Sequence, residues 1–236
     1  MPYFDLNSTN LNTNVHTILY ITVCLILCVI AYVLYTKTNI HVVCKDLIIG
    51  HSFYNYNEFK SIRELLKSHN VASKMTYDER EPQRKSHIIM DKTLNRDLEH
   101  ILISKNLKRI LEKALDGKVA VDHIYPIEYR EYDTQSQGMK WHVDKSLFFN
   151  PYFECILTLE NNTYSMFQYY DDEGVIQSVV PKPNTLICVT PNTIPHQVTP
   201  TLKGSRTILK FVVTFEHNRP NNKAIKNEMS GSDDIV

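Results

Sequence analysis

The pattern of apolar and polar positions divides the chain into three parts. Residues 17–36, TILYITVCLILCVIAYVLYT, carry no charge and are apolar on every face of a helix. Residues 58–69 and 94–115 space their apolar side chains at steps of three and four, which predicts amphipathic helices. From 119 to 215, short runs of β-branched and aromatic residues are separated by Gly, Pro and Asn, which predicts strands. The order therefore indicates an apolar segment, a helical layer and a β core.

Shorter patterns complete this picture. Residues 40–44 favour a strand ahead of the first helix, and the polar stretch 73–86 favours a loop. The breaks after residue 117 are roughly eight to fifteen residues apart, which is typical of an all-β barrel or a two-sheet jelly roll. The expected fold class is mainly β with flanking helices (α+β). The polar tail 217–236 is expected to be disordered.

The apolar segment 17–36 is long enough to cross a bilayer. At about 1.5 Å per residue, twenty helical residues span the roughly 30 Å hydrocarbon layer. A cleaved signal peptide would need a basic region before the apolar stretch and a small-residue cleavage site, and neither is visible. We therefore predict one N-terminal transmembrane helix, with the bilayer as its partner. The expected parts are a tail 1–16, an anchor 17–36, a juxtamembrane and helical layer 37–117, a catalytic core 118–216 and a tail 217–236.

Charge is absent from one end of an otherwise balanced chain. The sequence has 26 basic and 26 acidic residues, but Asp5 is the only charged residue before Lys37. Lys37 and Lys45 follow the apolar segment, so the positive-inside rule predicts a cytosolic main domain. The sequon at Asn161 would be usable only in the ER lumen, which stays open as the alternative. Balanced charge gives no electrostatic footprint for nucleic acid.

The motif Trp141-His142-Val143-Asp144 is the first with a chemical meaning. It lies in the β-rich segment, and successive side chains of a strand point to opposite faces. His142 and Asp144 are therefore expected on one face, and Trp141 and Val143 on the other. An imidazole beside a carboxylate supplies two of the three ligands of a facial metal site.

His196, in Ile194-Pro195-His196-Gln197-Val198, is the candidate for the third ligand. Two histidines and one carboxylate leave three positions open on an octahedral metal, the arrangement of non-haem Fe(II) oxygenases. Zinc on the same ligands is the alternative, because it favours tetrahedral coordination and supports hydrolysis rather than oxygen chemistry.

A basic residue follows the third ligand at a short distance. Arg206 lies ten residues after His196, and a guanidinium binds a carboxylate through two parallel hydrogen bonds. It is placed to hold the far carboxylate of a keto acid that chelates the metal at its other end. Lys210 is a weaker substitute. Alternation puts Arg206, Ile208 and Lys210 on one face, so the pattern alone does not separate the two basic residues.

The motif His142-x-Asp144, the distal His196 and Arg206 ten positions later together resemble the 2-oxoglutarate/Fe(II)-dependent dioxygenases. The prolyl-4-hydroxylase-like branch is the most similar, and the resemblance covers about residues 118–216. It implies a double-stranded β-helix (jelly-roll) core in which the two histidines and Asp144 bind iron. It also implies that Arg206 anchors the C5 carboxylate of 2-oxoglutarate.

The resemblance carries further expectations. Tyr132, ten residues before His142, matches a tyrosine that hydrogen-bonds the co-substrate. The implied activity is hydroxylation of a C–H bond with release of succinate and CO2, and the implied catalytic residues are His142, Asp144, His196 and Arg206. Fe(II), 2-oxoglutarate and O2 are the implied cofactors and co-substrates, with ascorbate by family analogy. Membrane-bound members of the branch share the order of anchor, helical layer and core.

The sequence also departs from that branch. Collagen-type prolyl hydroxylases have Lys where this chain has Arg206, and the Gly-rich segment before the motif is reduced to Gly138. The substrate is therefore unknown, with a protein or peptide favoured, peptidyl proline only by analogy, and nucleic acid unlikely. A zinc-dependent hydrolase and a non-catalytic membrane-tethered binding module of the same fold stay open as alternatives.

Several residues near the motif are weaker candidates for the site. Alternation would point Ser146 and Thr158 into the pocket. Phe148, Phe149 and Tyr152 are predicted on a loop after the motif, where aromatic side chains are candidates for a substrate lid.

Overall fold

The structure is a computed structural model that describes residues 18–28, 39–77, 84–121, 125–134, 136–215 and 218–222. The chain divides into two compact units, Met1–Lys37 and Thr38–Val236. In the first unit, residues 18–28 form a helix, and the remainder of the predicted anchor lies outside the described residues. No helix within the described ranges is long and apolar enough to cross a membrane. The predicted tail 1–16 also lies outside these ranges, as does the predicted tail 217–236 apart from residues 218–222. Disorder was wrong for these five residues, because their backbone bonds Leu147 and Phe149.

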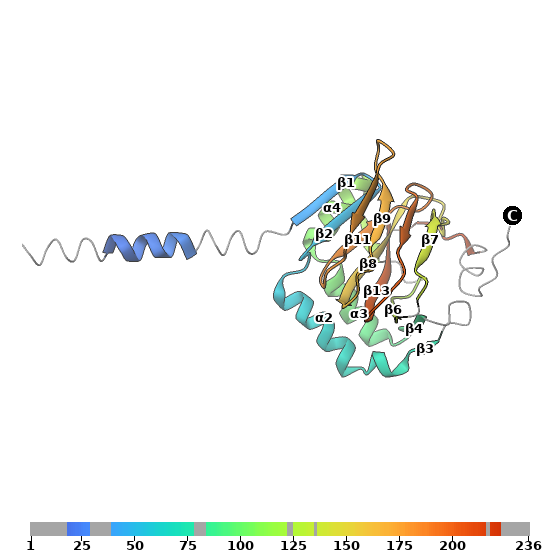
Figure 1. Ribbon diagram of the computed structural model, residues 1–236, viewed down its shortest axis with the longest axis horizontal. Helices are drawn as coiled ribbons and strands as arrows, with labels where there is room; N and C mark the ends of the chain where they lie inside the picture. The colour runs from blue at the N-terminus through green and yellow to red at the C-terminus, as the bar shows by residue number, and fades with distance from the viewer. Residues whose placement is uncertain are drawn as a thin grey trace, which may run out of the picture. The chain divides into compact units, whose positions relative to one another are not determined.

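The second unit is built on two antiparallel sheets (Figure 1). The major sheet runs, in order, β1 (Asn39–Cys44), β2 (Leu47–His51), β11 (Leu186–Val189), β8 (Tyr152–Asn161), β13 (Arg206–Phe215), β6 (Glu128–Tyr132), β4 (Arg84–Ile88) and β3 (Thr76–Tyr77), with β5 (Val119–Val121) also paired to β13. The minor sheet runs β10 (Ile176–Val179), β9 (Phe167–Tyr170), β12 (His196–Val198) and β7 (Met139–His142). A mainly β fold with two sheets was expected, and its arrangement is that of a jelly-roll core.

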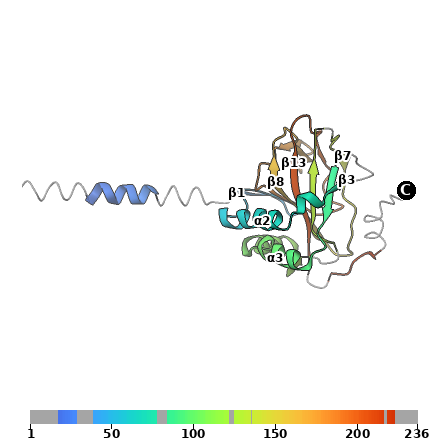
Figure 2. The same cartoon turned by 90° about the horizontal axis from the view of Figure 1, so that it is seen from below.

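The helices lie on one side of the major sheet. Figure 2 shows α2 (Tyr56–Ser68) and α3 (Lys92–Leu102) against the same face of this sheet. The helix predicted at 58–69 is confirmed, and it begins earlier because Asn55 caps it. The Asn55 side chain accepts from the Glu58 N–H, and the Glu58 carboxylate accepts from the Asn55 N–H, which closes a capping box.

The single helix predicted over 94–115 is wrong, because the structure has two. α3 ends at Leu102, and α4 (Lys105–Leu115) begins after the two intervening residues Ile103 and Ser104. Ser104 starts the second helix, since its hydroxyl accepts a hydrogen bond from the backbone N–H of Leu107. The apolar spacing continues from one helix into the next, so it does not reveal the break at the Ser104 cap.

The loop predicted over 73–86 is also only partly right. A short 3₁₀ helix (Val71–Lys74) and β3 occupy its start, residues 78–83 lie outside the described residues, and β4 begins at Arg84. β4 pairs along its length with β6, and Lys85 lies 3.7 Å from the Glu131 carboxylate across that pairing. The strand forms because a neighbouring edge satisfies its backbone, which local polarity does not reveal.

The two faces of the major sheet bury different side chains. On β8 and β13, Leu157 and Leu209 belong to the apolar core that the sheet shares with α2, α3 and α4. Their neighbours Ile156 and Ile208 face the opposite side and line a cavity between the two sheets. This strand alternation separates a helix-side core from a barrel interior, and the candidate site lies in the interior.

Candidate metal centre

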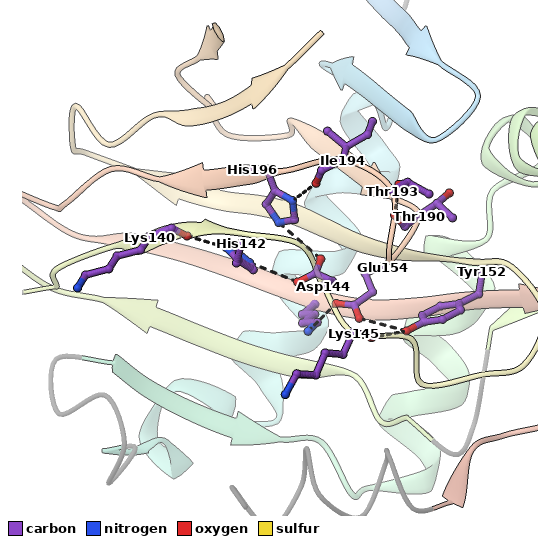
Figure 3. Close-up of polar contacts among 11 residues, drawn as sticks. Lys140, His142, Asp144, Lys145, Tyr152, Glu154, Thr190, Thr193, Ile194 and His196 are labelled. Atoms are coloured by element: carbon purple, nitrogen blue, oxygen red, sulfur yellow. Dashed lines mark hydrogen bonds and ion pairs between the residues drawn. The ribbon is translucent and has the colours of Figure 1, made fainter. Parts of the chain in front are cut away.

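His142, Asp144 and His196 come together at the minor sheet (Figure 3). His142 ends β7 and is paired directly with His196, the first residue of β12. The Nε2 atom of His142 lies 3.3 Å from Asp144 Oδ1, and the Nε2 atom of His196 lies 3.5 Å from Asp144 Oδ2. One ligand atom from each residue lies within 4.8 Å of the others, so a single ion can contact all three.

Backbone hydrogen bonds orient both imidazole rings. His142 Nδ1 lies 2.7 Å from the Lys140 carbonyl oxygen, and His196 Nδ1 lies 3.0 Å from the Ile194 carbonyl oxygen. A carbonyl oxygen only accepts, so each Nδ1 carries the hydrogen. Figure 3 shows both Nε2 atoms directed at the Asp144 carboxylate, and in the neutral rings each Nε2 keeps its lone pair. This tautomer is the one that binds a metal through Nε2.

The Nε2 atoms of both histidines face the carboxylate oxygens of Asp144 in this cluster. Burial would raise the pKa of Asp144, but the adjacent His142 ring, His196 and the Lys210 charge outweigh it and lower that pKa. The close contact with the Asp144 carboxylate raises the pKa of His142, whereas burial lowers the pKa of His196. His142 Nε2 is buried without a hydrogen-bond partner. A divalent cation would satisfy all three groups at once, so the residues present fit a metal.

The backbone around the ligands is held at two points. The Asn192 N–H donates to the Asp144 carbonyl at 2.9 Å, which ties the ligand segment to the turn before β12. Gly138 precedes β7 with a φ of +70°, and a Cβ there would lie 2.1 Å from the Val198 carbonyl oxygen. A side chain at this position would therefore push β7 away from β12 and separate the two histidines.

Arg206 opens β13 on the cavity side and is paired in register with Tyr132. It is only 3% exposed, and its Nε is buried without a hydrogen-bond partner. Among the described residues, no carboxylate lies within ion-pair distance of its guanidinium. Burial lowers the pKa of Arg206, because the charged form is desolvated. An unpaired buried guanidinium fits a carboxylate ligand, which would supply the missing charge and hydrogen bonds.

The other buried cations of the cavity already have partners. Lys210 Nζ lies 2.7 Å from Glu154 Oε2, and Arg130 lies 2.6 Å from Glu128 Oε2. Arg206 and Lys210 share the cavity-facing side of β13, as alternation predicted. The carboxylate beside Lys210 distinguishes the two basic residues, and it leaves Arg206 as the cation available to a ligand.

Sequence reasoning missed Glu154 and Arg130 as residues of the cavity wall. Glu154 is the single charged residue in the apolar run Tyr152 to Leu159, which was a usable signal for a buried functional charge. Arg130 lies within the run Glu128-Tyr129-Arg130-Glu131, where alternating charged residues give no signal of burial.

The weaker candidates divide. Tyr132 lines the cavity, whereas Ser146 and Thr158 are not among its lining residues. The Ser146 hydroxyl instead donates to the Phe148 carbonyl at 2.7 Å. The predicted lid loop is wrong for Tyr152. This residue is fully buried at the start of β8, because it is already part of the ladder between β8 and β13. Phe149 is 65% exposed.

Comparison with known proteins identifies the fold. No protein-family model matches the sequence, and no curated protein matches it. Among solved structures, a prolyl-4-hydroxylase from Pseudomonas putida matches with a TM-score of 0.54 at 11% identity, covering 72% of this chain and 93% of that one. HygX from Streptomyces hygroscopicus, with nickel, 2-oxoglutarate and hygromycin B bound, matches at 0.54 and 9% identity, covering 73% and 84%. A Trichoplax adhaerens prolyl hydroxylase in complex with a peptide fragment of the hypoxia inducible factor oxygen degradation domain matches at 0.52 and 12%, covering 77% and 86%.

These likenesses define the class of fold. The chain has the fold of the 2-oxoglutarate/Fe(II) oxygenases, and prolyl-4-hydroxylases are among the structures that it matches. The resemblance noted in the sequence is confirmed at this level. At such low identities the likeness establishes the fold, while the chemistry has to be argued from the residues of the site.

Proposed function

We propose that this protein is a Fe(II)- and 2-oxoglutarate-dependent dioxygenase that hydroxylates a C–H bond, with release of succinate and CO2. One observation carries the proposal: the cavity has a ligand cluster suited to a divalent metal and, on the facing sheet, a buried guanidinium that has no carboxylate partner within the described part of the chain. A keto acid that chelates the metal and extends a second carboxylate to Arg206 would satisfy both.

Each site residue has a role that follows from its contacts. His142, Asp144 and His196 would hold Fe(II), and their backbone hydrogen bonds keep both Nε2 lone pairs directed at the ion. Arg206 would bind the C5 carboxylate of 2-oxoglutarate, and Tyr132, its neighbour across the strand pairing, would hydrogen-bond the same co-substrate. When bound, iron and 2-oxoglutarate supply the oxidising chemistry with O2, while the chain orients them and excludes water. Ascorbate is an expected requirement by analogy.

A protein or peptide substrate is favoured over other classes. The matched Trichoplax enzyme is a prolyl hydroxylase with a bound peptide, which supports a peptide, and peptidyl proline in particular, by analogy. HygX holds hygromycin B, so the shared fold accepts other substrates as well. The formal net charge of zero supports no nucleic-acid substrate.

Residues 17–36 are proposed to tether the enzyme to a membrane, with the main domain in the cytosol. The support is the uncharged twenty-residue stretch and the lysines that follow it. Fractionation of cells expressing the full chain, with and without carbonate extraction, tests the tether. Recovery of the chain in the soluble fraction would rule it out.

The activity is tested with the full-length chain purified in mild detergent. We expect succinate to form from 2-oxoglutarate only when Fe(II) and O2 are present, and His142→Ala and Asp144→Ala each to abolish it. His100→Ala, which removes an exposed histidine on α3, is the matched control and should retain turnover. Turnover in the ligand variants equal to that of the wild type would contradict the proposal. Activity with Zn(II) but without 2-oxoglutarate would favour the hydrolase, and binding without turnover would favour the binding module.

A further inference from the structure

The segment that carries Asp144 lies outside the regular sheet. β7 ends at His142, and residues 143–147 form no strand. A ligand on such a segment depends on other contacts to hold its position, because no ladder of backbone hydrogen bonds fixes it. The Asn192 N–H holds the Asp144 carbonyl on the side of β12. The other side of the segment faces the major sheet.

Tyr152 is the contact on that side. Its ring is fully buried, and its hydroxyl oxygen accepts a hydrogen bond from the Leu147 N–H at 2.8 Å. The hydroxyl lies 3.4 Å from the Lys145 carbonyl oxygen and 3.5 Å from Glu154 Oε1, and its single hydrogen is shared between these two acceptors. Figure 3 shows the Tyr152 hydroxyl between Lys145 and Glu154. One side chain of β8 therefore binds the backbone on both sides of Ser146.

Glu154 and Lys210 fix this tyrosine in turn. Glu154 lies two residues after Tyr152 on the same face of β8, and its other carboxylate oxygen is 2.7 Å from Lys210 Nζ on β13. The side chains of Glu154 and Lys210 are 6% and 11% exposed, so water screens the pair little. The Lys210 ammonium also lies 5.3 Å from the centre of the Tyr125 ring. The ion pair holds the carboxylate oriented toward the Tyr152 hydroxyl.

The contacts form one continuous path from the central strands of the major sheet to a metal ligand. It runs from Lys210 through Glu154 and Tyr152 to the Lys145 carbonyl and the Leu147 N–H, which belong to the segment that follows Asp144. We propose that Tyr152, held by Glu154 and Lys210, is a positioning residue that sets the place of the Asp144 carboxylate at the metal centre. The inference rests on the proposed function only in assuming that the three ligands bind a metal.

The test uses Co(II) as the probe, because its visible absorption reports the ligand geometry. The full-length protein is titrated with Co(II), and the dissociation constant and the spectrum are compared between the wild type and Tyr152→Phe. We expect Co(II) to bind about tenfold more weakly, the lower end of the effect of losing an outer-shell partner, and the absorption bands to shift. At saturating Fe(II) the turnover number should be retained, while the Fe(II) concentration for half-maximal activity rises.

Tyr54→Phe is the matched control. Tyr54 is also buried, and its hydroxyl donates to the Leu102 carbonyl at 2.8 Å in the helix-side core. Both substitutions delete one buried hydroxyl, so both should lower the melting temperature, but only Tyr152→Phe should weaken Co(II) binding. A Co(II) dissociation constant and spectrum equal to those of the wild type in Tyr152→Phe would overturn the inference.

A second variant covers the case in which Tyr152→Phe does not fold. Glu154→Gln/Lys210→Met removes both charges together, so neither is left buried and unpaired. We expect it to weaken Co(II) binding in the same direction, by less than the roughly tenfold effect expected for Tyr152→Phe, because it removes the support of the tyrosine and not the tyrosine hydroxyl itself. An unchanged dissociation constant would overturn the inference. If instead the wild type shows no Co(II) binding that His142→Ala removes, the proposed function fails and not the positioning role.

Discussion

The two faces of the major sheet differ in polarity, although neighbouring residues of the same strands form them. On β13, Leu209 and Phe211 are buried against the helices, whereas Arg206, Ile208 and Lys210 line the cavity. The helix side is apolar and close-packed, so its stabilisation comes from removing surface from water. The cavity side buries charges, which are tolerated where they are paired. Adjacent residues of one strand therefore serve either the stability of the core or the chemistry of the cavity.

A large loss of stability without loss of ligand binding is expected on the helix side. Leu209→Ala should reduce the free energy of unfolding by about 2–5 kcal/mol, because it leaves a cavity in a packed core. Folded Leu209→Ala should still bind metal and 2-oxoglutarate as the wild type does. Denaturant unfolding and ligand titration measure the two effects. The neighbouring substitution Ile208→Ala is the comparison, since it changes the cavity wall and should weaken 2-oxoglutarate binding. A large loss of ligand affinity in Leu209→Ala would contradict the separation of the two faces.

Arg206→Met should affect the ligand-free protein and 2-oxoglutarate binding differently. Without ligand, removing an unpaired buried charge is expected to leave the melting temperature unchanged or raise it. With Ni(II) present, 2-oxoglutarate should bind about 100-fold more weakly, since hydrogen bonds to charged groups contribute about 1.5–3 kcal/mol. Melting curves with and without 2-oxoglutarate measure both.

Lys210→Met is the matched control for Arg206→Met. This substitution leaves the Glu154 carboxylate buried without the Lys210 ammonium, so the ligand-free protein should lose about 3–5 kcal/mol of stability. Equal destabilisation of the ligand-free protein by the two substitutions would show that Arg206 has a partner within the fold and is not reserved for a ligand.

The smallest effect concerns acid stability. Burial would raise the pKa of Glu128, but the charges of Arg130, Lys210 and Arg84 outweigh it and lower that pKa. Its contribution to stability is therefore present above the unfolded value of about 4.3 and is lost as pH falls through the lower folded value. The difference in unfolding free energy between the wild type and Glu128→Gln should narrow below about pH 4. Glu160→Gln, which changes an exposed carboxylate paired with Arg63, should show no such narrowing.

Local patterns were sufficient where one strand or one helix decides the outcome. His142 and Asp144 share a face because strand side chains alternate, and this holds even though Asp144 lies just beyond the end of β7. The helix at 58–69 followed from apolar spacing in the same way. The break at Ser104 was missed because the apolar spacing continues across it, and the cap that starts the second helix consists of a single side-chain hydrogen bond.

Pairing between distant strands decided the rest. The ligand His196 meets His142 only because β12 pairs with β7, and Tyr152 reaches the Asp144 segment only because β8 packs behind it. No local pattern states which buried charge has a partner, since Glu154 and Lys210 lie on different strands.

The sequence by itself determined the residue types of the site, their spacing and the alternation that directs them. These depend on covalent geometry, which acts over a few residues. Only the tertiary structure decided that Lys210 is neutralised by Glu154 while Arg206 faces the cavity without a carboxylate among the described residues. That distinction depends on distances of a few ångströms between groups far apart in the chain, because the strength of a buried charge interaction is set by its nearest partner.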